Sequence, residues 1–170
     1  DMPNGGEALV MGNLIHQGVN NDNSAMVSFG AEGLTHPTNR LVAVNNTLVS
    51  DDNSTLFFQA TDNSDIYLVN NLMIGHGTIS NQHALSQSNF QTTTNPGLVD
   101  IANYNYRLGQ NSISATDTGT LISGYTFEVP IPIYQYKHPR SYEPRPDDGF
   151  IDIGAYEYQF IQSSQYNLYQ

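Results

Sequence analysis

The chain has 170 residues, of which 12% are charged, and its formal net charge is -11 at pH 7. This length suits one domain with a hydrophobic core. The excess of 16 acidic over 5 basic residues argues against a nucleic-acid partner, because phosphate binding needs basic patches. The absence of cysteine excludes disulfides, thiolate catalysis and a cysteine-ligated zinc site.

The chain begins with a turn rather than a targeting segment. Residues 1–6 contain Asn4-Gly5-Gly6 and lack the basic and apolar regions of a signal peptide. No apolar stretch approaches the ~20 residues that span a bilayer, so no membrane span is predicted. We therefore expect the chain to be cut from a longer protein.

An apolar run, an asparagine and a second apolar run recur three times, in residues 9–15, 42–49 and 68–74. Repeats of roughly 20 to 50 residues are typical of solenoids and propellers. The unequal spacing of the three repeats indicates that the loops connecting their strands differ in length from one repeat to the next. The aligned asparagines are Asn13, Asn46 and Asn71.

Further short β-branched and aromatic runs lie between these repeats, in residues 25–29 and 56–60, and polar turns bound them. One period then holds two or three strands, which favours a parallel β-solenoid. In a solenoid, an asparagine at a corner tolerates left-handed backbone and extends a hydrogen-bond ladder along the axis. We assign this structural role to the three asparagines, in preference to a sugar contact.

The segment before the second repeat holds the first candidate ligand residues. Glu32 lies between Gly30 and Gly33, and small residues let a backbone approach a ligand closely. His36 and Arg40 follow in the same segment. Arg40 is a candidate base or substrate contact, and the alternative is a residue at a coil edge.

The stretch from residue 124 to 146 holds five prolines, which cannot donate to a sheet ladder, so it is predicted as a loop. Three of the five basic residues of the chain gather there beside tyrosines, as in a groove for sugar acids. A closing strand is predicted after this loop, because the apolar residues Ile151, Ile153 and Ala155 occupy every second position, as on the buried face of a strand. The candidate ligand residues of the loop are Tyr134, Tyr136, Lys137, Arg140 and Arg145.

Two later stretches carry a resemblance to a known family. One is Asn95-Pro96-Gly97-Leu98-Val99-Asp100 with Asp117-Thr118-Gly119-Thr120, and the other runs from Arg145 to Glu157. Together with the asparagine repeats, they resemble the C-terminal part of secreted bacterial right-handed parallel β-helix proteins of the pectate-lyase-like superfamily. The resemblance implies a secreted or cell-surface location. It is compatible with polysaccharide lyases, hydrolases and adhesin-like proteins.

The expected fold is therefore all-β, a right-handed parallel β-helix of about three to four coils with an irregular C-terminal closing region. We place coils in residues 1–123, the proline- and tyrosine-rich loop and closing strand in 124–158, and a tail in 159–170.

The expected function is that of a C-terminal segment that binds or processes polysaccharide. Any lyase or hydrolase coils would lie upstream of Asp1, because basic residues are few. The alternative is a structural, self-assembling extracellular fibre or adhesin subunit. Its first coil would be covered either by N-terminal coils of a parent chain or by end-to-end copies.

No metal site is predicted, since no established calcium or zinc motif is present. Calcium at Asp51, Asp52 and Asn53, or at Asp147 and Asp148, is the alternative.

Overall fold

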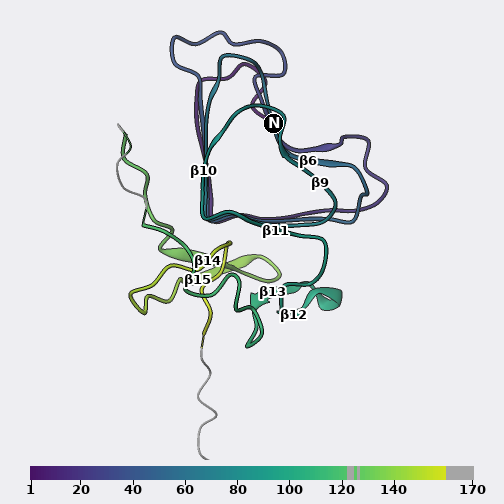
Figure 1. The fold of residues 1–170 in the computed structure, drawn as a ribbon, viewed down its shortest axis with the longest axis vertical. Coiled ribbons are helices and arrows are strands. Elements are labelled where there is room, and N and C mark those ends of the chain that lie inside the picture. Colours follow the sequence, from purple (N-terminus) through teal and green to yellow (C-terminus); the bar gives the residue numbers. More distant parts are fainter. Residues whose placement is uncertain (122–124, 126, 160–170) are drawn as a thin grey trace, which may run out of the picture.

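The computed structural model describes residues 1–121, 125 and 127–159. Over these residues the fold is all-β, and three parallel sheets surround a common core (Figure 1). The first sheet contains β1 (Glu7–Met11), β4 (Arg40–Val44), β7 (Asp65–Val69) and β10 (Leu85–Gln87). The second contains β2 (Leu14–Gln17), β5 (Thr47–Ser50), β8 (Leu72–Ile74) and β11 (Phe90–Thr92). The third contains β3 (Ala25–Phe29), β6 (Thr55–Ala60) and β9 (Gly77–Ser80).

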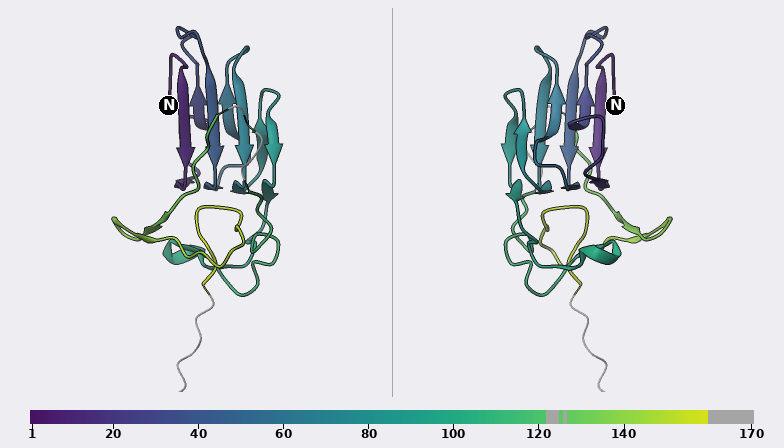
Figure 2. Two further views of the ribbon diagram at one scale, coloured as in Figure 1. Left: turned by 90° about the vertical axis from the view of Figure 1, so that its left-hand side faces the viewer. Right: turned by 90° about the vertical axis from the view of Figure 1, so that its right-hand side faces the viewer.

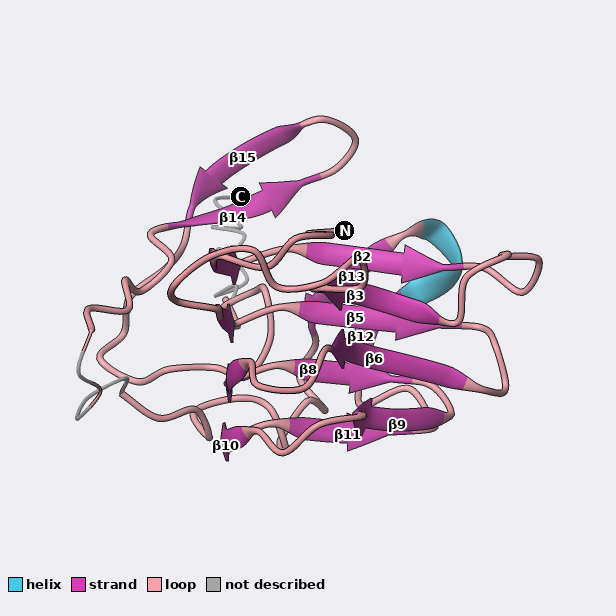
Figure 3. Ribbon diagram, turned by 90° about the horizontal axis from the view of Figure 1, so that it is seen from above, coloured by secondary structure: helices cyan, strands magenta, loops and turns pink. Residues whose placement is uncertain are grey.

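The chain visits these sheets in the same order each time, and we call one visit to all three a circuit. The strands of successive circuits lie one above another in register (Figure 3). Parallel strands need such long connections, because a short turn reverses the chain direction. The circuits are β1–β2–β3, β4–β5–β6 and β7–β8–β9, and β10–β11 begins a fourth.

A sharp corner separates the first and second strands of every circuit. The first corner residue has positive φ, with values of 67° at Gly12, 50° at Asn45, 54° at Asn70 and 49° at Ser88. Glycine and asparagine adopt this backbone at low cost. The second corner residue is an asparagine in every circuit, and these residues are Asn13, Asn46, Asn71 and Asn89.

Side chains that point inward form the main core. Leu41 and Ala43 on β4 meet Leu68 on β7 and the rings of Phe57 and Phe58 on β6, and all five are almost completely buried. Strand alternation produces this arrangement, since every second residue of the first sheet faces the interior. The core therefore runs along the stack of circuits.

The region after β11 packs on the sides of the stack, and Figure 2 shows that it does not cover the ends. It contains a 3-10 turn η1 (Ile101–Asn103) and two antiparallel pairs. These are β12 (Leu98–Asp100) with β13 (Asn105–Leu108), and β14 (Tyr134–Lys137) with β15 (Ser141–Pro144). No helix among the described residues is long and apolar enough to cross a membrane.

Two side faces of the stack carry this region. The outer side chains of Val49, Leu72 and Ile74 on the second sheet pack against residues such as Tyr106 and Ile153. The outer face of the first sheet packs against another segment, and the contacting residues there are Val42, Val44, Val69, Tyr125, Phe127 and Val129. The C-terminal region is thus a lateral cover.

The predicted closing strand is absent. Residues 151–157 form no ladder, and the whole stretch from Asp152 to Glu157 is buried instead of alternating. Gly154 has φ of 105°, which bends the chain, and the Asp152 and Glu157 side chains turn inward to accept backbone N–H groups. The alternation of apolar residues is misleading here, because the polar groups of this buried loop are paired both within the loop and with distant residues.

The predicted loop of residues 124–146 contains the β14–β15 hairpin. Pro144 is tolerated at the end of β15, where it is opposite Tyr134. The last strand of the parallel sheets ends at Thr92, well before the predicted limit of the coils. That limit, between residues 123 and 124, and the predicted tail from residue 160 onward lie outside the described residues.

Candidate functional site

An aromatic cluster lies on the outer face of the first sheet. The ring of Tyr67 on β7 meets Tyr125 edge-on at 5.2 Å and Phe127 at 4.9 Å between centroids. The Arg40 guanidinium lies over the Phe127 ring, 4.2 Å from its centroid. A segment distant in sequence therefore builds one apolar surface with β4 and β7.

Two hollows flank this cluster. One has a volume of about 260 Å³, and Glu7, Leu9, Arg40 and Phe127 are among the residues that line it. The other has a volume of about 430 Å³ and is lined on one side by Tyr67. Because Phe127 lines the first hollow, Tyr67 lines the second, and their rings touch, the cluster lies between the hollows. The polar residues of the second hollow are Ser64, Asp65, Gln82 and His83.

The charges in the first hollow are balanced locally. Arg40 Nη1 donates to Glu7 Oε1 at 3.0 Å, and the Arg40 side chain is mostly buried whereas Glu7 is exposed. Burial raises the pKa of the neighbouring Tyr125 hydroxyl, and Tyr67 contributes to this rise. The surface thus offers rings, hydroxyl and carboxylate groups, and its guanidinium is already paired.

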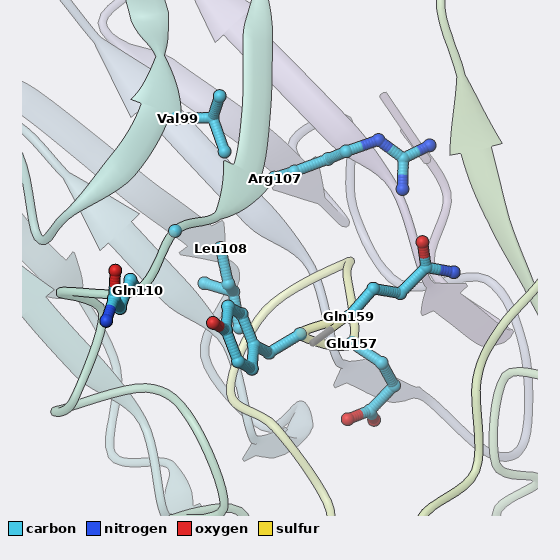
Figure 4. A pocket seen from close by; sticks show the side chains of 8 residues that line it. Val99, Arg107, Leu108, Gln110, Glu157 and Gln159 are labelled. Carbon is cyan, nitrogen blue, oxygen red and sulfur yellow. The ribbon is translucent and has the colours of Figure 1, made fainter. Parts of the chain in front are cut away.

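A second candidate site lies beneath β13, where a pocket of about 430 Å³ is lined by Arg107, Gln110, Glu157 and Gln159, among others (Figure 4). In Figure 4 the Glu157 carboxylate points away from the Arg107 guanidinium. Arg107 Nη2 instead donates to Glu143 Oε1 at 2.5 Å. The partner of Arg107 is therefore a glutamate on β15, 36 residues away in the sequence.

The most perturbed carboxyl group of this pocket belongs to Glu157. Burial raises the pKa of Glu157 to about 7, against the opposing effect of the Arg145 guanidinium. Arg145 Nε donates to Glu157 Oε1 at 2.8 Å, and its side chain is only 3% exposed. By contrast, the Gln135 hydrogen bond and then Arg107 hold the pKa of Glu143 below its usual value. A carboxyl group that titrates near neutral pH can exchange a proton at the pH of most enzymes.

A third polar cluster joins the stack to its cover. His16 Nε2 lies 2.9 Å from Asp51 Oδ2, and His16 Nδ1 lies 2.6 Å from the Tyr106 hydroxyl. Burial, followed by Asp51 and Tyr104, raises the pKa of the Tyr106 hydroxyl. Tyr106 is almost fully buried, whereas His16 and Asp51 are exposed, so the cluster joins β2 to β13 at the surface of the protein.

The candidate residues near the second repeat are only partly brought together. Arg40 N donates to Gly6 O, and the His36 ring packs against the same glycine. Glu32 is exposed, and its amide instead donates to Pro3 O at 2.9 Å. Arg40 thus belongs to the aromatic surface, His36 lies near it, and Glu32 lies apart.

The candidate residues of the predicted loop do not form one basic cluster. Lys137 lies opposite Ser141 at the turn of the hairpin beside Arg140, and both are exposed. Arg145 lies at the other end of the hairpin, about four residues or ~13 Å along the strands, and is buried with Glu157. Tyr134 packs edge-on against Tyr142, and the Tyr136 hydroxyl donates to Pro139 O at 2.9 Å.

Sequence reasoning missed the residues that make the aromatic surface. The outward orientation of Tyr67 was predictable from the sequence, because Tyr67 lies between the inward-facing Ile66 and Leu68 on one strand. Tyr125 and Phe127 offered no such signal, since nothing local tells which sheet they cover. Within the described ranges, no three histidine or acidic side chains are placed to hold a metal ion.

Comparisons with protein-family models, with curated proteins and with solved structures find no match to this chain.

Proposed function

We propose that the three parallel sheets form a right-handed parallel β-helix of about three to four coils. The repeated order of the sheets and the in-register stacking of their strands support this proposal. In such a fold, loops and outer faces are free to vary while the interior stays packed. The lateral cover, described in residues 93–121, 125 and 127–159, is then its irregular closing region.

We propose further that this chain binds polysaccharide on the outer face of its first sheet. The observation that carries this proposal is the contact of Tyr67 with Tyr125 and Phe127 between two hollows that each contain polar side chains. Binding sites for small organic groups combine apolar and aromatic walls with a few polar groups, and tyrosine offers both in one side chain. A secreted or cell-surface location follows from this role.

The charges favour a neutral polymer over an acidic one. The net charge is -11, and Arg40 is already paired with Glu7. A polyanion would meet repulsion from the whole molecule and find no unpaired guanidinium at the aromatic surface. Calcium stays the untested alternative to the prediction of no metal site.

Binding can be tested by calorimetry against neutral glucans, mannans and polygalacturonate. Removing one ring of the cluster, Phe127→Ala, should weaken binding of a neutral polymer about tenfold or more, the equivalent of about 1.4 kcal/mol. Tyr142→Ala is the matched control, because Tyr142 is an exposed ring of the hairpin. Equal affinities of the two variants, or no binding by the wild type, would contradict the proposal.

Glu157 supports a second candidate function, the cleavage of polysaccharide in the pocket beneath β13. A carboxyl group with a raised pKa beside an arginine can act as a general acid or base. Glu157→Gln should then abolish product formation while polymer binding at the aromatic surface persists. Activity of the variant equal to the wild type would leave Glu157 a purely structural group.

A further inference from the structure

The outer face of the β14–β15 hairpin carries three tyrosines. Tyr136 lies opposite Tyr142 in the register, and Tyr134 lies two residues before Tyr136, so the three side chains share one face. The Tyr134 and Tyr142 rings are diagonal neighbours that meet edge-on, with 5.1 Å between their centroids. These two residues are 51% and 70% exposed, and Figures 2 and 3 show that the hairpin projects from the body of the protein. Two exposed phenol rings are therefore held in contact.

The opposite face of the hairpin fixes it to the rest of the lateral cover. Gln135 and Glu143 lie opposite each other in the register, and Gln135 Nε2 donates to Glu143 Oε1 at 2.8 Å. Gln135 Oε1 accepts the Glu157 N–H, and Glu143 Oε1 also accepts from Arg107 Nη2. Because these contacts lie on the inner face, a chemical change to the outer tyrosines leaves them in place.

The composition makes tyrosine the residue of this chain for oxidative cross-linking. The chain has no cysteine, so it forms no disulfide, but it has 11 tyrosines. Two tyrosines can be joined by a carbon–carbon bond between their rings, and the product is dityrosine. This reaction needs a one-electron oxidant, access of the oxidant to both hydroxyls, and two rings already close together. Closeness matters because it replaces a chance encounter with a reaction between neighbours.

We propose that Tyr134 and Tyr142 are a site of oxidative modification, at which a peroxidase using hydrogen peroxide joins the two rings as dityrosine. Each hydroxyl gives up one electron and one proton, and the two electrons and two protons reduce one hydrogen peroxide to two waters. A ring carbon next to the hydroxyl-bearing carbon of one tyrosine then bonds to its counterpart in the other. Each of these carbons loses its hydrogen as a proton while the phenolic oxygen of the same ring regains one. The product therefore lacks two hydrogens.

A second pair of touching tyrosines meets these requirements less well. The Tyr67 and Tyr125 rings lie 5.2 Å apart, but both also pack against Phe127 and both residues are only partly exposed. Burial raises the pKa of the Tyr125 hydroxyl, so the loss of its proton is disfavoured. An oxidant in solution therefore reacts with the hairpin pair first.

The new bond ties β14 to β15 in addition to their backbone hydrogen bonds. A covalent link between two segments stabilises a fold mainly by restricting the unfolded chain. The cross-linked protein should therefore unfold at a higher urea concentration than the untreated protein. An unchanged midpoint would overturn this stabilising role.

Peptide mapping after oxidation tests the site itself. Dilute protein is treated with a peroxidase and hydrogen peroxide, denatured and digested with trypsin. Trypsin cuts after Lys137 and Arg140, which places the two tyrosines in separate peptides, 108–137 and 141–170. Mass spectrometry should find these peptides joined and lighter than their sum by two hydrogens, in a product that ran as a single chain before digestion.

Three conservative variants locate the bond. Tyr134→Phe and Tyr142→Phe each keep the ring and remove the hydroxyl, so neither should give the joined peptides. Tyr136→Phe is the matched control on the same face of the hairpin and should give them as the wild type does. The Tyr136 hydroxyl is already bonded to Pro139 O, and its residue is less exposed than the other two.

Joined peptides from Tyr134→Phe would overturn the proposal, because another tyrosine of residues 108–137 would then be the partner. A wild type that gives covalent dimers only, or that joins peptide 41–107 to 108–137 instead, would also overturn it. The absence of any cross-link in the wild type, under conditions that couple free N-acetyltyrosine, would do the same.

Discussion

Adjacent asparagines at the corners have two different structural roles. Asn46 and Asn71 extend the ladder inside the stack, whereas Asn45 and Asn70 point outward and bind the lateral cover. Asn45 Nδ2 donates to the Asp152 and Gly154 carbonyls, and Asn70 exchanges two hydrogen bonds with the Thr120 backbone at 2.9 Å. These two corners therefore fix both the circuit and the cover.

Replacing a buried ladder residue should destabilise the protein strongly. Asn71→Ala removes both groups of a side chain that accepts from Asn46 and donates to Ala43 O and Asn89 Oδ1. Because buried groups are left without partners, we expect a loss of about 3 kcal/mol in the free energy of unfolding. Urea denaturation measures it. Asn13→Ala, at the exposed end of the same ladder, should cost clearly less; equal losses would contradict this account.

The stability of the protein should fall as the pH rises from about 5 to about 7. The pKa of Glu157 is about 7 in the folded state and 4.5 when unperturbed, so the folded state binds the proton more tightly. The resulting stabilisation is fully present below the lower value and is lost through the higher one. Urea denaturation of Glu157→Gln at several pH values should show a flatter dependence than the wild type. Glu128→Gln, an exposed control, should leave the dependence unchanged.

At the scale of elements, repeated apolar runs bounded by polar turns predicted the strands β1 to β8 of the parallel sheets. Residues 42–49 and 68–74 contain β-branched and apolar residues that the interior requires, and each corner asparagine was visible between them. Asn89 was missed because the polar run Ser86-Gln87-Ser88 precedes it instead of an apolar strand. Residues 151–157 show the converse error, since their burial depends on polar contacts with distant backbone that no local pattern records.

The buried closing segment should tolerate no side chain at Gly154. A Cβ there would lie 2.8 Å from Thr47 Oγ1 and 3.2 Å from Leu72 Cβ, with φ at 105°. Gly149 has a similar φ of 92° but no atom within 4 Å of its Cβ position. Gly154→Ala should therefore cost about 2 kcal/mol more than Gly149→Ala in thermal or urea unfolding. Similar costs would mean that the segment shifts easily on the second sheet.

At the scale of the whole molecule, three arginines are neutralised by glutamates that are distant in sequence. Arg40 pairs with Glu7, Arg107 with Glu143, and Arg145 with Glu157. The sequence predicted a basic cluster of Lys137, Arg140 and Arg145 because these residues are neighbours along the chain. The lateral cover instead pairs Arg145 with Glu157 and leaves the other two exposed on the hairpin. The aromatic surface was hidden for the same reason, since it exists only after residues 125–129 reach the first sheet.

The net negative charge of the protein should determine whether it binds a neutral or an anionic polymer more tightly. With a net charge of -11, the protein should bind polygalacturonate more weakly than a neutral polymer at low ionic strength. Raising the salt concentration screens the repulsion, so the affinity for the anionic polymer should rise while that for the neutral polymer stays constant. Calorimetry at two salt concentrations measures this. An affinity for the anion that falls with salt would instead indicate a basic contact, such as Lys137 and Arg140 on the hairpin.

The ladder asparagines follow one another after 33, 25 and 18 residues, yet each step adds one strand to a sheet. One strand adds about 4.8 Å of height however many residues the circuit contains. The number of residues per unit of height therefore falls by almost half from the first step to the last. Chain length and molecular height are thus independent. Residues added to a loop enlarge the cross-section of the stack and leave its length along the axis unchanged.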